Sequence, residues 1–270
     1  MCSISQRLMA LALASVSSPA LAAGDLLVAP TRVVLDGPRG TEVILNNVGA
    51  QPATYRVSLE LKRMTAKGEL EGVAPAAETV KEKAALAMIS YAPRRVVLAP
   101  NQPQAIRIGV RAPADLPDGE YRVHMLFRAI PDVAAASATP APTEGLSISL
   151  TPIYGITIPI IIRKGALKAN AAISDAKMTR NGDGAALAFS LGRTGERSTY
   201  GRIRVTKAGI SKPVFEASGV AVYAEINSRI VSLPVSPEVA AQLSGPAKIE
   251  YLESSDTGGG TIASAQVVIR

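Results

Sequence analysis

The sequence predicts an all-β protein built from two β-sandwich domains, with one long strand at the end of the first domain. Short segments of alternating apolar and polar residues recur along the chain and are separated by turn residues. Helices do not alternate with strands in the way that a parallel sheet requires. The stretch Leu146–Arg163 alternates over a greater length than an ordinary strand of about 5–6 residues. The 270 residues are enough for two ordinary domains.

The first 23 residues are typical of a secretory signal peptide. Arg7 precedes the short apolar run LMALALASV, and Ala20, Ala22 and Ala23 form a small-residue cleavage pattern. This run is too short to span a bilayer, and no later segment has the uninterrupted length of a membrane helix. Cys2 is the only cysteine and precedes the cleavage pattern. We therefore expect residues 1–23 to be removed, leaving a secreted chain without a disulfide or membrane insertion.

The first domain is predicted to comprise residues 24–163. Pro30 lies inside its first strand, which suits an edge strand or a strand that switches between sheets. Residues 65–87 are polar and alanine-rich and are predicted to form a loop excursion, with a short helix over residues 76–87 as an alternative. Residues 132–145 are low in complexity and are predicted to be mobile. The expected strands cover residues 25–35, 41–47, 53–63, 89–98, 104–111 and 120–131.

The long strand has two different halves. Its sequence, LSISLTPIYGITIPIIIR, places an apolar or aromatic residue at every even position. Residues 156–162 are apolar on both faces, as expected of a strand buried in its own domain. Residues 146–150 have small hydroxyl residues opposite the apolar row. This first half is either a strand that pairs with another protein by β-strand addition, or part of a long sandwich strand broken near Pro152 and Gly155.

Lys164 and Gly165 mark the predicted start of the second domain, residues 164–270. Turns are expected at residues 181–184 and 258–260, and residues 237–243 are predicted to form one helical turn. About seven short strands in roughly 100 residues are typical of an immunoglobulin-like sandwich. The expected strands, shorter than those of the first domain, cover residues 167–176, 185–191, 201–207, 213–223, 229–235, 247–253 and 261–269.

Five motifs occur in order in the first domain. They are Pro30-Thr31-Arg32, Thr41–Asn47 with Val48-Gly49, Leu98–Asn101 with Ile106–Ile108, Leu116–Arg122 with Ala129–Pro131, and Tyr154–Arg163. Together they make residues 25–165 resemble the periplasmic pilus-assembly chaperones of the chaperone–usher pathway, the PapD-like family. The final motif most resembles the archaic, spore-coat-like branch. The second domain is similar to this family only in its general pattern.

The resemblance implies a periplasmic protein with two immunoglobulin-like sandwiches set at an angle and a subunit-binding cleft between them. It also implies that the long strand completes the fold of a pilus or fimbrial subunit that lacks one strand, and that an outer-membrane usher then receives the subunit. No cofactor is implied. The apolar residues expected to enter the groove of the subunit are Leu146, Ile148, Leu150, Tyr154 and Ile156.

The resemblance further implies two basic residues in the cleft that hold the C-terminal carboxylate of the subunit. Arg32 matches the first of them. Pro159 stands where the second, a lysine, is expected. Arg163 or Lys164 are the alternatives nearby in sequence. Further candidates that could approach in space are Arg94, Arg95 and Arg122.

Composition and motifs point away from other classes of function. The formal net charge of +7 suits either acidic partners or general solubility. Lysine-rich runs interleaved with aromatics do not occur, so nucleic acid is not expected as a partner. His124, the only histidine, is predicted to be a surface or interface residue, and it cannot form a zinc cluster alone. A G-x-S-x-G motif does not occur either, so we expect neither an enzyme nor a metal site.

Two hypotheses therefore follow from the sequence. The first is a chaperone of pilus subunits, which could also self-associate through its apolar strand when no subunit is bound. The second is a secreted two-domain structural or adhesive protein, in which the long strand is internal and the protein itself covers its apolar face.

Overall fold

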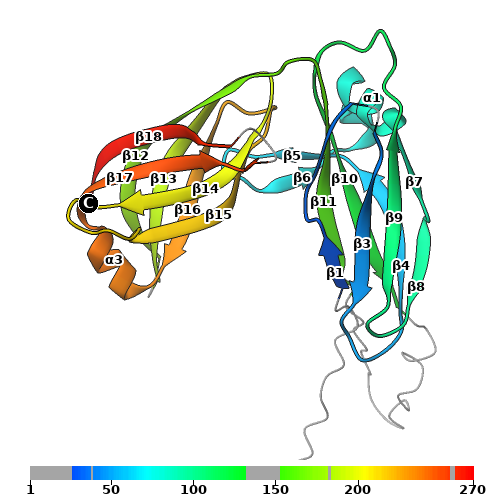
Figure 1. The fold of residues 1–270 in the computed structure, drawn as a ribbon, viewed down its shortest axis with the longest axis horizontal. Coiled ribbons are helices and arrows are strands. Elements are labelled where there is room, and N and C mark those ends of the chain that lie inside the picture. Colours follow the sequence, from blue (N-terminus) through cyan, green and yellow to red (C-terminus); the bar gives the residue numbers. More distant parts are fainter. Residues whose placement is uncertain (1–25, 38, 132–152, 182–183, 256–258) are drawn as a thin grey trace, which may run out of the picture.

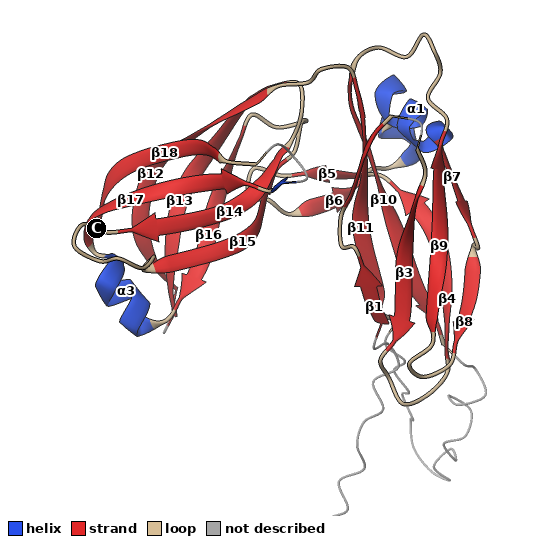
Figure 2. Cartoon of the chain, in the orientation of Figure 1, coloured by secondary structure: helices blue, strands red, loops and turns tan. Residues whose placement is uncertain are grey.

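The computed structural model describes residues 26–37, 39–131, 153–181, 184–255 and 259–270. These residues form two β-sandwiches set at an angle to one another (Figure 1). Strands dominate both of them, and the described part of each contains one short α-helix (Figure 2). The predicted fold class is confirmed. The predicted signal peptide and residues 146–150 lie outside the described residues.

The first sandwich consists of two sheets with the strand orders β1-β3-β9-β7 and β2-β11-β10-β4-β8. Its core is formed by residues that alternate along each strand, such as Tyr121, Val123, Met125 and Phe127. The strands are β1 (Leu26–Ala29), β2 (Val33–Asp36), β3 (Thr41–Asn47), β4 (Ala53–Glu60), β7 (Ile89–Ala92), β8 (Arg95–Leu98), β9 (Pro103–Val110), β10 (Gly119–Ile130) and β11 (Gly155–Lys164).

The first strand switches sheets at Pro30, which is one of the two alternatives that the sequence leaves open. Before this proline, β1 pairs antiparallel with β3. After it, β2 pairs parallel with β11 in the opposite sheet, with Val33 beside Ile160. Proline lacks the N–H group that a continuous ladder needs, so the pairing ends here and can resume elsewhere.

Residues 65–87 contain more regular structure than the predicted loop excursion. The hairpin β5 (Lys62–Met64) and β6 (Leu70–Gly72) is followed by the 3₁₀ turn Pro75–Ala77 and the helix α1 (Val80–Met88). Thr79 and Glu82 form a capping box at the start of α1, which satisfies backbone N–H groups that a helix start leaves unpaired. The loop prediction is therefore wrong for this part, and the alternative of a short helix is confirmed.

The second sandwich has the strand orders β12-β13-β16 and β15-β14-β17-β18 around a core of its own. Its longest strand, β12, has 13 residues, so these strands are not the shorter ones expected. A bulge between Ser174 and Lys177 lets β12 continue past the predicted end. The elements are β12 (Ala169–Asn181), β13 (Gly184–Gly195), β14 (Thr199–Thr206), β15 (Phe215–Val222), β16 (Ser228–Val235), the predicted helical turn α3 (Pro237–Leu243), β17 (Gly245–Glu253) and β18 (Thr261–Ile269).

The chain crosses from one sandwich to the other only between the end of β11 at Lys164 and the start of β12 at Ala169. We propose that the boundary between the two domains lies in this connection, next to the residues 163 and 164 predicted from the sequence. A small apolar cluster of Met64, Ala221 and Tyr223 joins residues from both sandwiches at their junction.

Candidate protein-binding site

One edge of β11 is only partly paired. Over its whole length β11 pairs with β10. On its other side, β2 covers only Ile160–Arg163. Among the described residues, no strand pairs with this second edge over Gly155–Pro159. Ile153 and Tyr154, which lead into this edge, are 48% and 50% exposed. An open strand edge next to exposed apolar side chains is a surface on which another strand can pair.

The predicted groove-filling residues differ in what already covers them. Tyr154 is half exposed, and its carbonyl accepts a hydrogen bond of 2.9 Å from the N–H group of Ala129. Ile156 packs against the core of the first sandwich and is partly buried there. Leu146, Ile148 and Leu150 lie outside the described residues. The binding role of all five stays a prediction, and of the described pair Tyr154 is the more accessible.

Arg32 lies at the junction of the two sandwiches. It directly precedes β2, and its Cζ atom lies 4.4 Å from the ring centre of Tyr200, at the start of β14. A guanidinium over an aromatic face makes a favourable cation–π contact. Arg32 therefore brings a positive charge to the junction between the sandwiches, and its guanidinium nitrogens are buried there. Its role as a carboxylate anchor stays a prediction.

The two alternatives for the second basic residue have partners within the chain. Arg163 Nε donates to Glu120 Oε2 over 3.1 Å, and these side chains are only 8% and 1% exposed. Lys164 Nζ donates to the carbonyls of Ala114 and Leu116. Pro159 is paired with His124 of β10. The structure therefore places neither Arg163 nor Lys164 as an uncommitted cation.

Of the three arginines expected to approach the cleft in space, Arg94, Arg95 and Arg122, it is Arg122 that contacts the second sandwich. It donates to Glu225 through two bonds of 2.9 and 2.6 Å, and its Cζ atom lies 3.7 Å from the ring centre of Tyr223. The N–H group of Met64 also donates to Glu225, over 2.8 Å. Burial alone would raise the pKa of Glu225, but these donors outweigh it and the pKa is lowered. Glu225 thus stays ionised and fastens the two sandwiches together.

His124 is completely buried in the same junction. Its ring lies 6.2 Å from the ring of Tyr223 in an edge-on arrangement. Within the described part of the chain, neither ring nitrogen has a hydrogen-bond partner. Burial lowers the pKa of His124 to about 3, with further lowering by the charges of Arg122 and Lys62. His124 is therefore neutral at physiological pH, and the interface alternative predicted for it is the correct one.

Further contacts hold the angle between the sandwiches. The hairpin β5–β6 reaches across from the first sandwich, as Figure 1 shows, and the carbonyl of Ala66 accepts a 2.7 Å bond from the N–H group of Ile230. Glu120 accepts a 3.0 Å bond from the N–H group of Ser198. The sequence contains one signal for this junction: Glu120, Arg122 and His124 alternate with core residues along β10, so they share its outer face.

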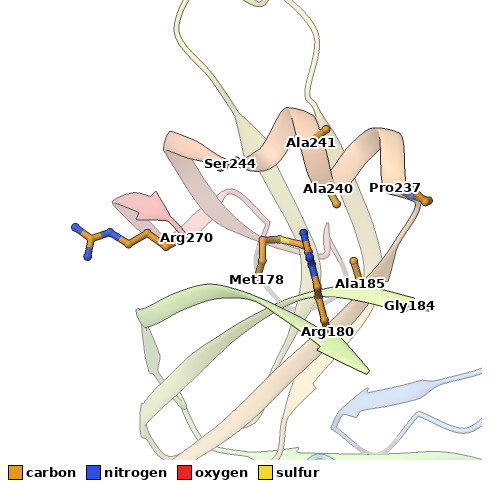
Figure 3. Close-up of a pocket in the computed structure, with 9 residues that line it drawn as sticks. All are labelled: Met178, Arg180, Gly184, Ala185, Pro237, Ala240, Ala241, Ser244 and Arg270. Atoms are coloured by element: carbon orange, nitrogen blue, oxygen red, sulfur yellow. The ribbon is translucent and has the colours of Figure 1, made fainter. Parts of the chain in front are cut away.

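A separate pocket of about 490 Å³ lies in the second sandwich, beside α3 (Figure 3). Arg180 and Arg270 are the charged residues of its lining. The lining therefore contains no acid–base pair of the kind used in catalysis. Across the described ranges, no three His, Cys, Asp or Glu side chains gather to hold a metal ion. No described helix is both long enough and apolar enough to cross a membrane.

Several solved structures of chaperones are similar to this chain. One is the YadV chaperone, with 15% identity, a TM-score of 0.47, and coverage of 90% of this chain and 100% of that one. Another is the CsuC–CsuE chaperone–tip adhesion subunit complex from the archaic Csu pili of Acinetobacter baumannii, with 14% identity, a TM-score of 0.47, and coverage of 92% and 100%. A third is the E. coli chaperone DraB, with 16% identity, a TM-score of 0.45, and coverage of 91% and 96%.

At these identities and TM-scores the likeness carries no argument about the function of this chain. No model of a known protein family matches the chain. A search of curated proteins finds no match either.

Proposed function

We propose that the protein is a periplasmic chaperone that binds and stabilises pilus or fimbrial subunits by donor-strand complementation and delivers them to an outer-membrane usher. The observation that carries this proposal is the open edge of β11 over Gly155–Pro159. Upstream of this edge, the exposed Ile153 and Tyr154 continue into the alternating apolar residues 146–150. A partner lacking one strand gains both backbone pairing and apolar anchors from such a segment.

The position of Arg32 suggests the direction of the incoming strand. Any strand that pairs with Gly155–Pro159 ends where β2 begins, since Val33 is already paired with Ile160. Arg32 directly precedes Val33 and so stands at this end of the edge. A strand parallel to β11, as β2 is, would bring its C-terminal end to Arg32. A guanidinium binds a carboxylate in a bidentate, charge-assisted way. To reach a C-terminal carboxylate at this end, the buried guanidinium of Arg32 would have to turn from Tyr200 toward the edge.

The expected anchors supply part of the affinity. Complete burial of a large apolar side chain is worth about 1.5–3 kcal/mol, so Leu146, Ile148 and Leu150 together would contribute about 5–9 kcal/mol. Association and the ordering of side chains cost about 4–15 kcal/mol. The anchors alone therefore only offset this cost. Backbone pairing along β11 and the contact of Arg32 with the carboxylate must supply most of the net affinity.

Co-purification tests the proposal. Each pilus subunit secreted by the same cells is co-expressed with the tagged protein, and the complex is recovered from the periplasm. The test variant changes Leu146, Ile148 and Leu150 to serine. A matched control variant makes the same change at three exposed apolar residues outside β11 and its neighbouring strands, namely Val80 of α1 and Ile210 and Val268 of the second sandwich.

We expect a subunit to co-purify with the wild type and the control variant and to be lost from the test variant. Equal recovery with both variants would show that the strand is not the donor. Recovery with none of the three proteins would favour the structural or adhesive protein instead. A complex that forms should also transfer its subunit to purified usher, and failure to do so would contradict the delivery step.

A further inference from the structure

Three arginines lie side by side on the outer face of the sheet β2-β11-β10-β4-β8. Arg128 of β10 is paired with Arg56 of β4, and Arg56 is paired with Arg95 of β8. All three are exposed. Neighbouring strands lie about 4.8 Å apart, so the three Cα atoms span about 10 Å. We refer to these three residues as the arginine row.

Nothing acidic neutralises the arginine row within the described residues. The adjacent positions on the same face carry uncharged side chains, namely Leu126, Ser58, Thr54, Ile130 and Val97. Glu60 is the next acidic residue along this face, and it already accepts a 2.9 Å bond from Thr157 and lies 3.3 Å from Lys62. Like charges that face one another on adjacent strands destabilise a sheet. The row is therefore a local excess of positive charge that an anionic partner would relieve.

The arginine row opens toward the unpaired edge of β11. Beyond Arg128, the position on β11 that is in line with the arginine row is Gly155, which is paired with Arg128. A Cβ atom at Gly155 would lie only 3.1 Å from Leu126 Cδ1, so a larger residue would be crowded there. A strand added at the edge would stand two strand spacings, about 10 Å, from Arg128. An extended arginine and a carboxylate side chain can bridge that distance, since no side chain rises from Gly155 between them.

We infer that the arginine row is a second contact for the bound subunit and recognises Asp or Glu side chains on the segment that pairs beside Gly155. This inference rests on the proposed function and specifies the chemistry of the partner, which must present carboxylates at this register. Arg32 would meet the end of the incoming strand, whereas the arginine row meets its side chains near the opposite end of the open edge.

The geometry favours a protein partner over an anionic membrane. The second sandwich meets the same face of this sheet at its other end, where Arg122 binds Glu225. Figure 1 shows that the second sandwich projects away from the first at this junction. A flat bilayer approaching the arginine row would meet the second sandwich, whereas a single strand and its side chains fit beside it.

The first test is independent of any subunit. A fluorescent peptide of six glutamates is titrated into three proteins, and binding is followed by anisotropy at several salt concentrations. The proteins are the wild type, the row variant with Arg56, Arg95 and Arg128 changed to glutamine, and a charge-matched control with Arg39, Arg107 and Arg111 changed to glutamine. These control arginines are exposed in the same sandwich.

We expect the row variant to bind the peptide about tenfold more weakly and with less salt dependence, since three exposed charge contacts are lost. The control should change less than about twofold. Thermal unfolding should show the row variant to be at least as stable as the wild type, because opposed like charges have been removed. Equal weakening in the row variant and the control would overturn the inference.

The second test uses the co-expressed subunit. The row variant should recover less subunit than the charge-matched control, and a subunit whose acidic residues on the paired segment are changed to amides should no longer distinguish the two proteins. If the wild type binds a subunit and the row variant recovers it equally well, the inference is wrong while the proposed function stands. If the wild type binds no subunit, the proposed function fails, and the peptide titration alone then tests whether the arginine row binds carboxylates.

A third measurement addresses the membrane alternative. Vesicles of phosphatidylcholine with phosphatidylglycerol are sedimented with each protein. Binding that is lost in the row variant and kept in the control would show that the row recognises lipid phosphates instead, and would overturn the inference. Equal sedimentation of all three proteins would agree with a protein partner.

Discussion

The ion pair between Arg122 and Glu225 is expected to couple the two sandwiches energetically. Its side chains are 9% and 27% exposed, and two hydrogen bonds of 2.9 and 2.6 Å join them. Removing one partner of a buried pair costs about 3–5 kcal/mol. Because about a quarter of Glu225 reaches solvent, we expect about 2–3 kcal/mol for Arg122→Ala or Glu225→Ala. The double variant should reveal a coupling energy of about 1.5–3 kcal/mol.

Urea denaturation of the wild type, the two single variants and the double variant gives this coupling energy directly. The exposed pair Arg204–Glu216, with side chains 31% and 37% exposed, serves as the control cycle. Its coupling should stay below about 1 kcal/mol. Loss of Glu225 should also broaden the range of interdomain angles seen by small-angle scattering. A coupling no larger than that of the control would refute the role assigned to this pair.

Three further predictions concern local features. The folded state holds the pKa of His124 at about 3, against an ordinary value of about 6.5, so the free energy of unfolding should decrease as the pH falls between these values. In urea denaturation, His124→Phe should therefore lose less of this free energy between pH 7 and pH 4 than the wild type does. An equal loss in both proteins would contradict this prediction. Thr79→Ala should cost about 1 kcal/mol by the same method because it removes the cap of α1, and Thr79→Ser should restore most of it. Gly201→Ala should lower the melting temperature because the new methyl group would clash with the carbonyl of Leu252, whereas Gly72→Ala, with no atom nearby, should leave it almost unchanged.

Alternation along single strands makes much of the fold predictable. The period of two places Val123, Met125 and Phe127 in the core without any knowledge of the sheet order. Pro30 indicates the sheet switch because its missing N–H group has a strictly local effect. The helix α1 is harder to predict, because its alanine-rich sequence has only a weak apolar face. Its start depends on the capping box of Thr79 and on the bonds of Arg63 to Glu82.

The individual contacts of the junction between the sandwiches could not be predicted, because they join residues that are distant in sequence. Arg122 and Glu225 are 103 positions apart, and neither has a local pattern that identifies the other. The arginine row could not be predicted from the sequence for a related reason. The alternation places Arg56 and Arg128 on outer faces, but only the order β10-β4-β8 makes them neighbours. The position of Arg32 directly before the second part of the first strand can be predicted, because it is local information, whereas its role as an anchor stays a prediction.

The short strand β2 has a consequence for when a partner could be captured. It occupies the edge of β11 from Ile160 onward and leaves Gly155–Pro159 open, a length of about 17 Å. A strand docked on this length must stop or turn sharply at Arg32. A chain end satisfies this condition without bending, while an internal strand would have to fold back. The C-terminus is the last part of a secreted chain to leave the export channel. Under the proposed function, such an edge would therefore accept subunits only after their export is complete.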